Sequence, residues 1–460
     1  MIMRYAQSFM AAVGQDKHER LKFLLLSLSF FLVIGSYTLI KELRDSIFVA
    51  IVGREYVPVA RILETFLLIP AIFFYAYLVD RLRRYQLLYV YAAFYGIVGF
   101  ICASVLGDSL IGLQNTDASP NRLFGWFFYF FVEGYAPFVV SLFWAFANSV
   151  NSPETAKNNY AWMVSGSKIG GMLSAGFAWW LLGWHFADGK RMFTDVVNHQ
   201  LLLCFFSCMV ILVPVVIYFL MKKVPGRYLH GYEAVYQFEK DHEKKEEESG
   251  KVGLLTGLSM LIKQPYVFGI FGMLFFYEMV NTILGYHRLG VIESSATNVS
   301  DFSFKLFEQA FMLHFIGFLI SVIGTRALLR WLGEERCLIL IPIVTGGLLW
   351  YFILSSNILV YVLVKSFNYA FAQPVRESLY IPTVKEIKFK SKSWIDAFGA
   401  KLARGSGSGV NMLTVFMGAG AGFASGLFGS IILLWVITAA LLGRRYTKAI
   451  AANEVIGQEE

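Results

Sequence analysis

Ionisable side chains interrupt several long apolar stretches of this sequence. They are Arg61, Glu64, Glu133, Lys168, Glu278, His314, Lys365, Lys401 and Arg404. A charge at the centre of a lipid bilayer costs roughly 2.5 to 3.5 kcal/mol or more unless it faces a cavity or a partner. So many charges therefore predict a polar cavity inside a bundle of helices. The basic residues outnumber the acidic ones, which favours an anionic ligand, with the carboxylates left to pair, to orient the ligand or to titrate.

The position of each charge within its stretch indicates which residues face the cavity. Glu133 and Lys168 lie near the middle of their stretches, too deep for the side chains to reach the interface, and Glu278 is similar. Arg404 opens the Gly/Ser-rich run 404–409, where a backbone can approach a ligand closely. A guanidinium at that place offers paired hydrogen bonds to phosphate oxygens.

Simpler explanations stay open for the other charges. Arg61 and Glu64 stand three residues apart on one helical face and can pair with each other. His314 is either a hydrogen-bonded histidine of the bundle or a titrating group, and Lys365 has no partner nearby in the sequence. The predicted substrate-binding residues are Arg61, Glu133, Lys168, Glu278, Lys365 and Arg404, and the candidates for proton coupling are Glu133, Glu278 and His314.

The elements that carry these residues are apolar segments long enough to cross a bilayer. The 460 residues are 57% hydrophobic and 16% charged, with a mean hydropathy of +0.57, whereas soluble domains carry about 25% charged residues. We predict an all-α membrane protein with about twelve transmembrane helices. The predicted spans are 22–41, 57–79, 85–106, 123–149, 159–183, 200–221, 265–285, 305–325, 337–355, 357–374, 397–422 and 427–443.

The basic residues concentrate on one side of the predicted topology. Lys and Arg favour both terminal segments and the loops on the same side, which predicts that the N- and C-termini are cytoplasmic. The net charge of +8 then reflects topology rather than nucleic-acid binding. We expect a multi-pass protein of the bacterial inner membrane, in contact with lipid and a small anion, without nucleic acid, and monomeric.

A hydrophilic stretch at 222–264, with a mixed charge run at 240–248, divides the chain into two halves. We expect an N-terminal six-helix bundle over 1–221, a charged cytoplasmic linker, and a C-terminal six-helix bundle over 265–460. Short echoes at matching places support a repeat: 146–150 with 371–375, and 165–171 with 404–409. This six-plus-six layout is typical of major-facilitator-like carriers.

Enzyme and metal signatures are missing from the sequence. It contains no HExxH, no Walker A loop and no G-x-S-x-G between strand and helix. The four cysteines form no CxxC pair and show no metal-ligand spacing with the histidines. We therefore expect no enzymatic activity, no metal and no cofactor.

Several motifs resemble the ATP/ADP translocases of plastids and of obligate intracellular bacteria. The most specific are the Arg-Glu-x-x-Tyr-Ile-Pro run at 376–382, the lysine-rich stretch at 385–392 and Ile-Asp-Ala-Phe-Gly at 395–399. Segments 142–148 and 43–45 resemble the family's fourth-span and first-span signatures. The resemblance covers nearly all predicted spans and implies a nucleotide carrier, distantly related to the major facilitators.

The resemblance also implies roles for individual residues. Glu133 and Glu278 match the family's glutamates in spans 4 and 7, Arg61 matches a basic residue of span 2, and Arg404 replaces a span 11 lysine thought to engage the nucleotide. Family lysines fall on Ile47, Thr282 and Asn368 here, and Lys168 stands where a neutral residue is expected. Losing cations from a phosphate site weakens binding, so a substrate with fewer phosphates remains an alternative to ATP and ADP.

Three hypotheses for the function follow. The first is a nucleotide carrier that performs ATP/ADP-type exchange by alternating access. The second is a proton-coupled or exchange carrier of another anionic metabolite, with Glu133, Glu278 or His314 as the titrating group. The third is a non-transporting membrane protein on the same fold.

Overall fold

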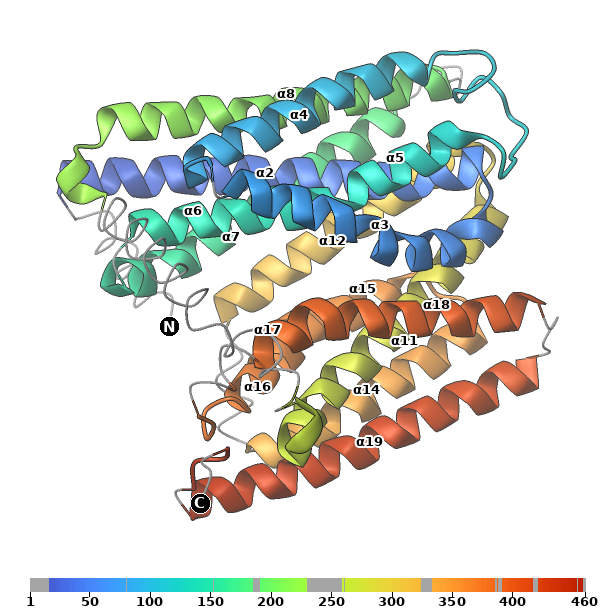
Figure 1. Cartoon of the computed structure of the whole chain (residues 1–460). Coiled ribbons are helices and arrows are strands. Elements are labelled where there is room, and N and C mark those ends of the chain that lie inside the picture. The colour runs from blue at the N-terminus through green and yellow to red at the C-terminus, as the bar shows by residue number, and fades with distance from the viewer. Residues whose placement is uncertain are drawn as a thin grey trace. The chain divides into compact units, whose positions relative to one another are not determined.

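The computed structural model describes residues 16–79, 81–151, 153–184, 191–229, 259, 261–323, 333–384, 387, 391–416, 421–452 and 454–457. Within these ranges nearly all regular structure is helical (Figure 1), with one isolated bridge between Thr383 and Ile456. Helices are the expected result, because a segment in lipid must satisfy its backbone amides and carbonyls within itself.

The chain divides into two compact units. Unit 1 comprises residues 1–56, 66–241 and 295–318, and unit 2 comprises 57–65, 242–294 and 319–460. The units differ from the predicted halves in that residues 57–65 belong to unit 2 and residues 295–318 belong to unit 1. The predicted boundaries at 221 and 265 stay predictions, because 230–258 and 260 of the linker lie outside the described residues.

Unit 1 is built around one long helix that packs against two others. Helix α2 lies against α7 and α8, and α8 lies against α4. The helices that contribute to this unit are α2 (Lys17–Ile51), η1 (Arg54–Tyr56), α3 (Val57–Val79), α4 (Arg84–Val105), α5 (Leu123–Glu133), η2 (Ala136–Val140), α6 (Ser141–Val150), α7 (Pro153–Leu182), α8 (Asp195–Lys223), η3 (Gly226–Tyr228) and α12 (Val299–Ile323).

The first helix is longer than the sequence predicts. The predicted span ends at residue 41, whereas α2 continues to Ile51. No glycine or proline occurs between Ser36 and Gly53, and Gly53 has a φ of 114°, a conformation that ends the helix at little cost only for glycine. Arg44 and Asp45 consequently lie buried in this helix instead of in an outer loop.

Glycines allow α2 and α7 to approach closely. A Cβ atom at Gly170 would lie 2.5 Å from the main-chain oxygen of Phe31, and a Cβ at Gly35 would lie 2.7 Å from Ser174 Oγ. Phe31 faces Gly170 and Gly35 faces Ser174, so the residue numbers increase in the same direction along both helices. The two helices therefore run parallel. Small residues of this kind are what membrane helices use to pack without a gap.

Gly170→Ala is expected to lower the melting temperature, whereas Gly166→Ala on the same helix is not. The added methyl at 170 meets backbone that cannot move aside, and overpacking of this kind costs about 1–3 kcal/mol. At Gly166 a Cβ meets no described atom within 4 Å. Thermal unfolding of both variants in detergent checks this, and equal melting temperatures would contradict the close contact.

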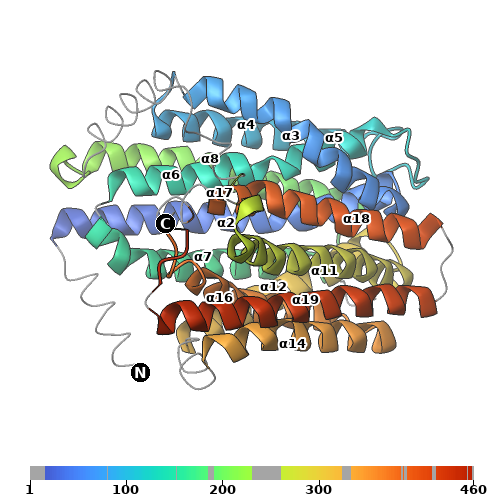
Figure 2. The same ribbon diagram turned by 60° about the horizontal axis from the view of Figure 1, so that its bottom comes forward.

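Unit 2 contains the remaining helices. In Figures 1 and 2, α14 and α19 lie side by side, and these two helices are in contact. The bounds are α11 (Pro265–Ser295), α14 (Glu334–Ser355), α15 (Leu359–Phe367), η4 (Asn368–Ala372), α16 (Gln373–Ser378), α17 (Lys392–Trp394), η6 (Ile395–Gly399), α18 (Ala400–Phe416) and α19 (Ala421–Ala451).

Three of the short elements are π-helical turns within longer helical segments. They are η2, between α5 and α6, η4, between α15 and α16, and η6, before α18. Such turns insert one residue into the helix and occur most often at functional sites. Predicted spans 4 and 10, which occupy matching places in the two halves, both contain one, and this supports the repeat.

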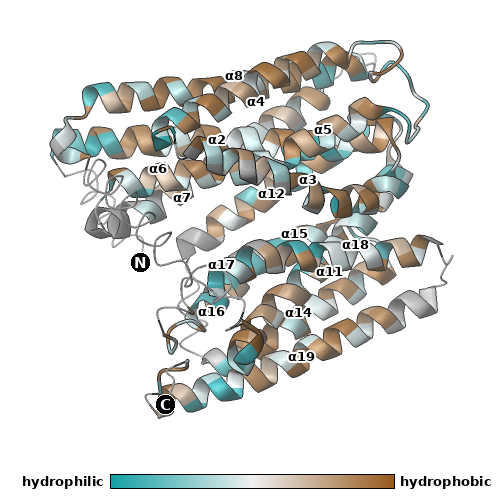
Figure 3. Ribbon diagram, viewed as in Figure 1, coloured by the Kyte–Doolittle hydropathy of each residue, from teal (hydrophilic) through white to brown (hydrophobic). Residues whose placement is uncertain are grey.

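Each of the twelve predicted spans overlaps described helix, and those at 305–325 and 397–422 also include residues outside the described ranges. Seven described helices are long and apolar enough to span a bilayer. Figure 3 shows apolar residues along much of α4 and α8, and hydrophilic residues around α16 and α17. The all-helical architecture agrees with the prediction, and the count of about twelve spans stays a prediction.

Candidate functional site

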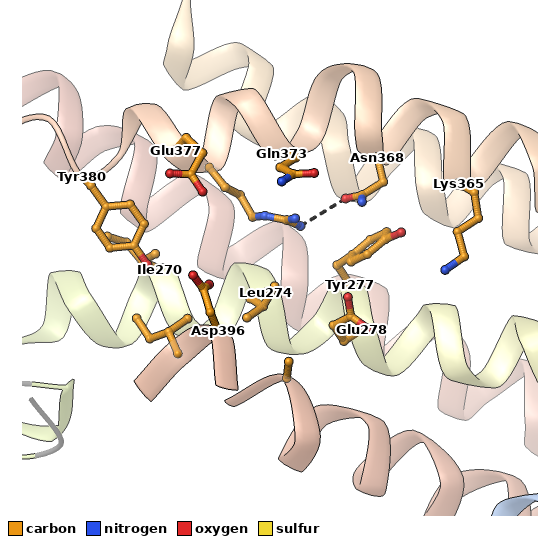
Figure 4. Close-up of a pocket in the computed structure, with 13 residues that line it drawn as sticks. Ile270, Leu274, Tyr277, Glu278, Lys365, Asn368, Gln373, Glu377, Tyr380 and Asp396 are labelled. Carbon is orange, nitrogen blue, oxygen red and sulfur yellow. Dashed lines mark hydrogen bonds between the residues drawn. The ribbon is translucent and has the colours of Figure 1, made fainter. Parts of the chain in front are cut away.

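A pocket of about 250 Å³ lies within unit 2. Its walls come from α11, the segment α15–η4–α16, η6 and the first residue of α18. In Figure 4, side chains from the α15–η4–α16 segment extend toward α11, and Asp396 extends toward the same space. The charged lining residues are Glu278, Lys365, Arg376, Glu377 and Asp396.

The π-helical turn η4 places pocket-lining side chains from before and after the turn on the same face of the α15–η4–α16 segment. In a regular α-helix, residues three or four apart share a face, whereas a π turn places residues five apart on one face. Lys365 and Asn368 precede the turn's extra residue, and Gln373 and Arg376 follow it. The insertion therefore lets all four side chains line the same pocket.

Arg376 is held in place by several groups of the pocket. Its Nη1 donates a hydrogen bond to Asn368 Oδ1 at 3.2 Å, and its guanidinium carbon lies 5.2 Å from the centre of the Tyr277 ring. Glu278, Asp396 and Glu377 act on it electrostatically. These contacts hold the guanidinium against an aromatic ring in a pocket that also carries carboxylates, and its planar fork is suited to bidentate recognition of a ligand.

The lining of the pocket includes both exposed and buried side chains. The Glu377 side chain is 51% exposed and pairs with Lys392 at 2.5 Å, whereas Tyr277 is buried. The apolar part of the lining includes Ile270 and Leu274 of α11.

Unit 1 contains a second cluster of buried charges. Arg44 of α2 forms ion pairs with Asp45 and with Glu133 at the end of α5, and lies 4.9 Å from the centre of the Tyr129 ring. Arg44 and Asp45 are 7% and 6% exposed. Glu133, predicted from its depth to face a cavity, is therefore paired with an arginine that the sequence placed outside the span.

The predicted residues of α3 and α18 make contacts within unit 2. Arg61 Nη1 donates to the main-chain oxygen of Thr282 at 3.1 Å, and Arg404 Nε donates to that of Ala400 at 3.4 Å. Glu64, which is buried, pairs with Lys401 rather than with Arg61. The simple i,i+3 pair considered from the sequence is therefore not formed.

The structure groups only some of the predicted residues. Glu278 and Lys365 line the unit 2 pocket together, and Lys168 and His314 both belong to unit 1. The binding and proton-coupling roles predicted for these residues stay predictions. Arg376, Glu377 and Asp396 were not predicted as site residues, although they stand in the motif at 376–382 and 395–399 and carry charges at the edges of predicted spans.

Comparison with known proteins identifies the family. The profile of the TLC ATP/ADP transporter family matches residues 123–360 and 354–446. The chain belongs to this family. Similar proteins include ADP,ATP carrier protein 1 of Chlamydia trachomatis, 22% identical over 95% of this chain and 91% of the relative, and ADP,ATP carrier protein 4 of Rickettsia felis, 23% identical over 87% and 86%.

Solved structures confirm the predicted major-facilitator-like fold. A bacterial homologue of the iron transporter ferroportin in the inward-facing state aligns with a TM-score of 0.61 at 14% identity, over 94% of this chain and 99% of that one. A D-xylose-proton symporter aligns with a TM-score of 0.57 at 14% identity, over 92% and 96%. At this identity the likeness concerns the fold alone.

Family membership confirms several predictions made from the sequence. The TLC ATP/ADP transporter is a multi-pass membrane carrier and not an enzyme, and ATP/ADP-type exchange is confirmed as the function at the level of the family. The resemblance drawn from the motif at 376–382 was thus correct. In the part of the chain that the structure describes, no group of acidic, histidine and cysteine side chains is arranged to hold a metal ion.

Proposed function

We propose that this transporter exchanges nucleotides across the bacterial inner membrane by alternating access, and that the unit 2 pocket binds the nucleoside end of the substrate. The relatives are named ADP,ATP carriers, so ATP and ADP are the first substrates to consider. The basic bias of the sequence supports cytoplasmic N- and C-termini. We further propose that the transporter acts as a monomer and binds no nucleic acid.

The main support for nucleoside binding in this pocket is the set of residues that line it. Tyr380 brings to the lining an aromatic ring of the kind on which bases stack. Asn368 and Gln373 carry amides of the kind that pair with adenine, and carboxylates accept hydrogen bonds from exocyclic amino groups. A site built for phosphates alone would be lined mainly by cations and backbone N–H groups.

The size and charge of the pocket suit one part of a nucleotide rather than the whole molecule. Pockets for whole drug-sized ligands measure about 300–1,000 Å³, and this one measures about 250 Å³. Three carboxylates, Glu278, Glu377 and Asp396, face two cations, Lys365 and Arg376. That balance fits a base and a ribose better than a chain of phosphates.

The same three carboxylates favour a second candidate, a proton-coupled carrier of another anionic metabolite. Carboxylates that line a pocket together with an arginine can exchange a proton for a substrate charge as the environment changes. In this case Glu278 would titrate, and accumulation would need no substrate on the far side.

Counterflow in proteoliposomes tests the proposal. Purified protein is reconstituted with unlabelled ADP inside, and uptake of labelled ATP, ADP, AMP and GTP is followed with and without a protonophore. We expect ATP and ADP uptake that requires internal nucleotide and is insensitive to the protonophore. Protein-free liposomes and vesicles without internal nucleotide are the controls.

Two other outcomes would decide against the proposal. Accumulation without internal nucleotide that collapses on addition of the protonophore would favour the proton-coupled carrier. A purified, folded protein that neither takes up nor binds any of the four nucleotides would leave the non-transporting alternative.

A further inference from the structure

Three basic side chains of unit 1 come together from three helices. They are Lys41 of α2, Lys168 of α7 and His314 of α12. Thr38 Oγ1 lies 3.0 Å from His314 Nε2, and a Cβ at Gly171 would lie 2.5 Å from the His314 ring. The imidazole is therefore inserted between α2 and α7, at the level of Thr38 and Gly171.

The two lysines lie on either side of this imidazole. Lys41 is one turn after Thr38 on α2, and Lys168 is one turn before Gly171 on α7, so each shares a face with the residue that touches the histidine. Because α2 and α7 run parallel, the lysines approach from opposite directions along the helices. Both act on His314 electrostatically.

His314 presents a hydrogen-bond acceptor in this space. Thr38 Oγ1 donates its proton to the main-chain oxygen of Ile34 at 2.9 Å, so it must accept from His314, whose Nε2 then carries the hydrogen. In the neutral ring Nδ1 is left as an acceptor. That atom is buried, and among the described residues none forms a hydrogen bond with it. A buried polar atom normally has a partner, and a bound ligand can supply one.

The lysines supply charge that an anion can use. Lys41 pairs with Glu42 at 3.2 Å, but its side chain is 34% exposed and remains accessible. Lys168 is half-buried. Ammonium groups are point charges with several donors each, suited to successive oxygens of a phosphate chain.

We propose that Lys41, Lys168 and His314 form a subsite within unit 1 that binds phosphate groups of nucleotides. Phosphate oxygens lie against the two lysines, and a protonated oxygen of the terminal phosphate donates to His314 Nδ1. This assignment rests on the proposed function, and it gives His314 an orienting role in place of proton coupling. It also assigns a phosphate-binding role to Lys168, which stands where the family has a neutral residue.

The dependence of binding on phosphate number tests this subsite. Full-length protein in detergent is titrated with AMP, ADP, ATP and inorganic tripolyphosphate, and the ligand-induced rise in melting temperature gives each affinity. In the wild type we expect affinity to increase from AMP to ATP, and tripolyphosphate to stabilise the protein. In Lys168→Gln, ATP affinity is expected to fall about tenfold to a hundredfold, the usual effect of losing a hydrogen bond from a charged group, while AMP affinity changes much less.

Two further variants complete the test, one within the proposed subsite and one as a control. Lys41→Gln alters a partly exposed side chain and is expected to reduce the preference for ATP over AMP in the same way. Lys448→Gln, at an exposed position of α19, is the matched control and should leave that preference unchanged. If Lys168→Gln does not fold, Lys41→Gln carries the test.

The result that overturns this inference differs from the one that overturns the proposed function. A wild type that binds AMP, ADP and ATP, with the same ATP-to-AMP preference in Lys168→Gln and Lys41→Gln, would place the phosphates elsewhere and leave nucleotide exchange intact. A wild type that binds no nucleotide would remove the proposed function itself.

Discussion

Arg376→Lys is expected to reduce the initial rate of nucleotide exchange by about thirtyfold, although the positive charge is kept. The guanidinium of Arg376 makes a directed hydrogen bond to Asn368 and lies over the Tyr277 ring. An ammonium cannot reproduce both contacts at once, because it lacks the planar fork. A loss of about 2 kcal/mol, within the range for charge-assisted hydrogen bonds, corresponds to that rate.

Exchange of labelled for unlabelled ATP in proteoliposomes measures this effect. Arg445→Lys is the matched control, because Arg445 also forms an ion pair in unit 2, with Glu454, but on the exposed surface. We expect the control to exchange at close to the wild-type rate, since exposed pairs contribute little. Wild-type exchange by Arg376→Lys, at equal amounts of folded protein, would show that the pocket does not recognise substrate through this arginine.

Which residues could be predicted from the sequence depended on where they lie in the helices. Glu278 and Lys365 were found because a charge inside an apolar run is conspicuous whatever its partners are. Arg376 and Asp396 fall just outside the predicted spans, where charges are common, so position alone gave them no weight. The family motif marked them, but it did not indicate that η4 and η6 fold them onto one pocket.

The sequence did not indicate which charged residues form ion pairs with each other. Glu64 and Arg61 have helical spacing, yet Glu64 pairs with Lys401, a residue far away in the chain. Arg44 lies beyond the predicted first span, which ends at residue 41, and only the continuation of α2 to Ile51 makes it a helical partner for Glu133. Long-range pairs follow from packing, which local periodicity does not specify.

The structure also bears on the lysines that this sequence lacks relative to its family. Arginines from other parts of the chain reach two of those places, since Arg61 donates to the main-chain oxygen of Thr282 at 3.1 Å and Arg376 donates to Asn368 Oδ1 at 3.2 Å. Positive charge is therefore present near these positions.

The ion pair between Arg44 and Glu133 leads to the second large effect. Arg44 is buried in α2, its Nε donates to Asp45 Oδ1 at 2.8 Å, and Glu133 is the partner that comes from α5. Glu133 also immediately precedes the segment containing the π-helical turn η2. The pair thus ties the end of α5, just before the winding changes at η2, to the C-terminal part of α2.

Glu133→Gln is expected to lower the free energy of unfolding in detergent by about 3 kcal/mol, because it leaves a buried guanidinium with less compensating charge. Asp45 still faces Arg44, so the loss should lie at the lower end of the usual range for breaking a buried pair. Glu454→Gln, which breaks the exposed pair with Arg445, serves as the control and should leave unfolding nearly unchanged. If Glu133→Gln is as stable as the wild type but no longer exchanges ATP, Glu133 acts on the substrate instead of on Arg44, and the structural reading of this pair is wrong.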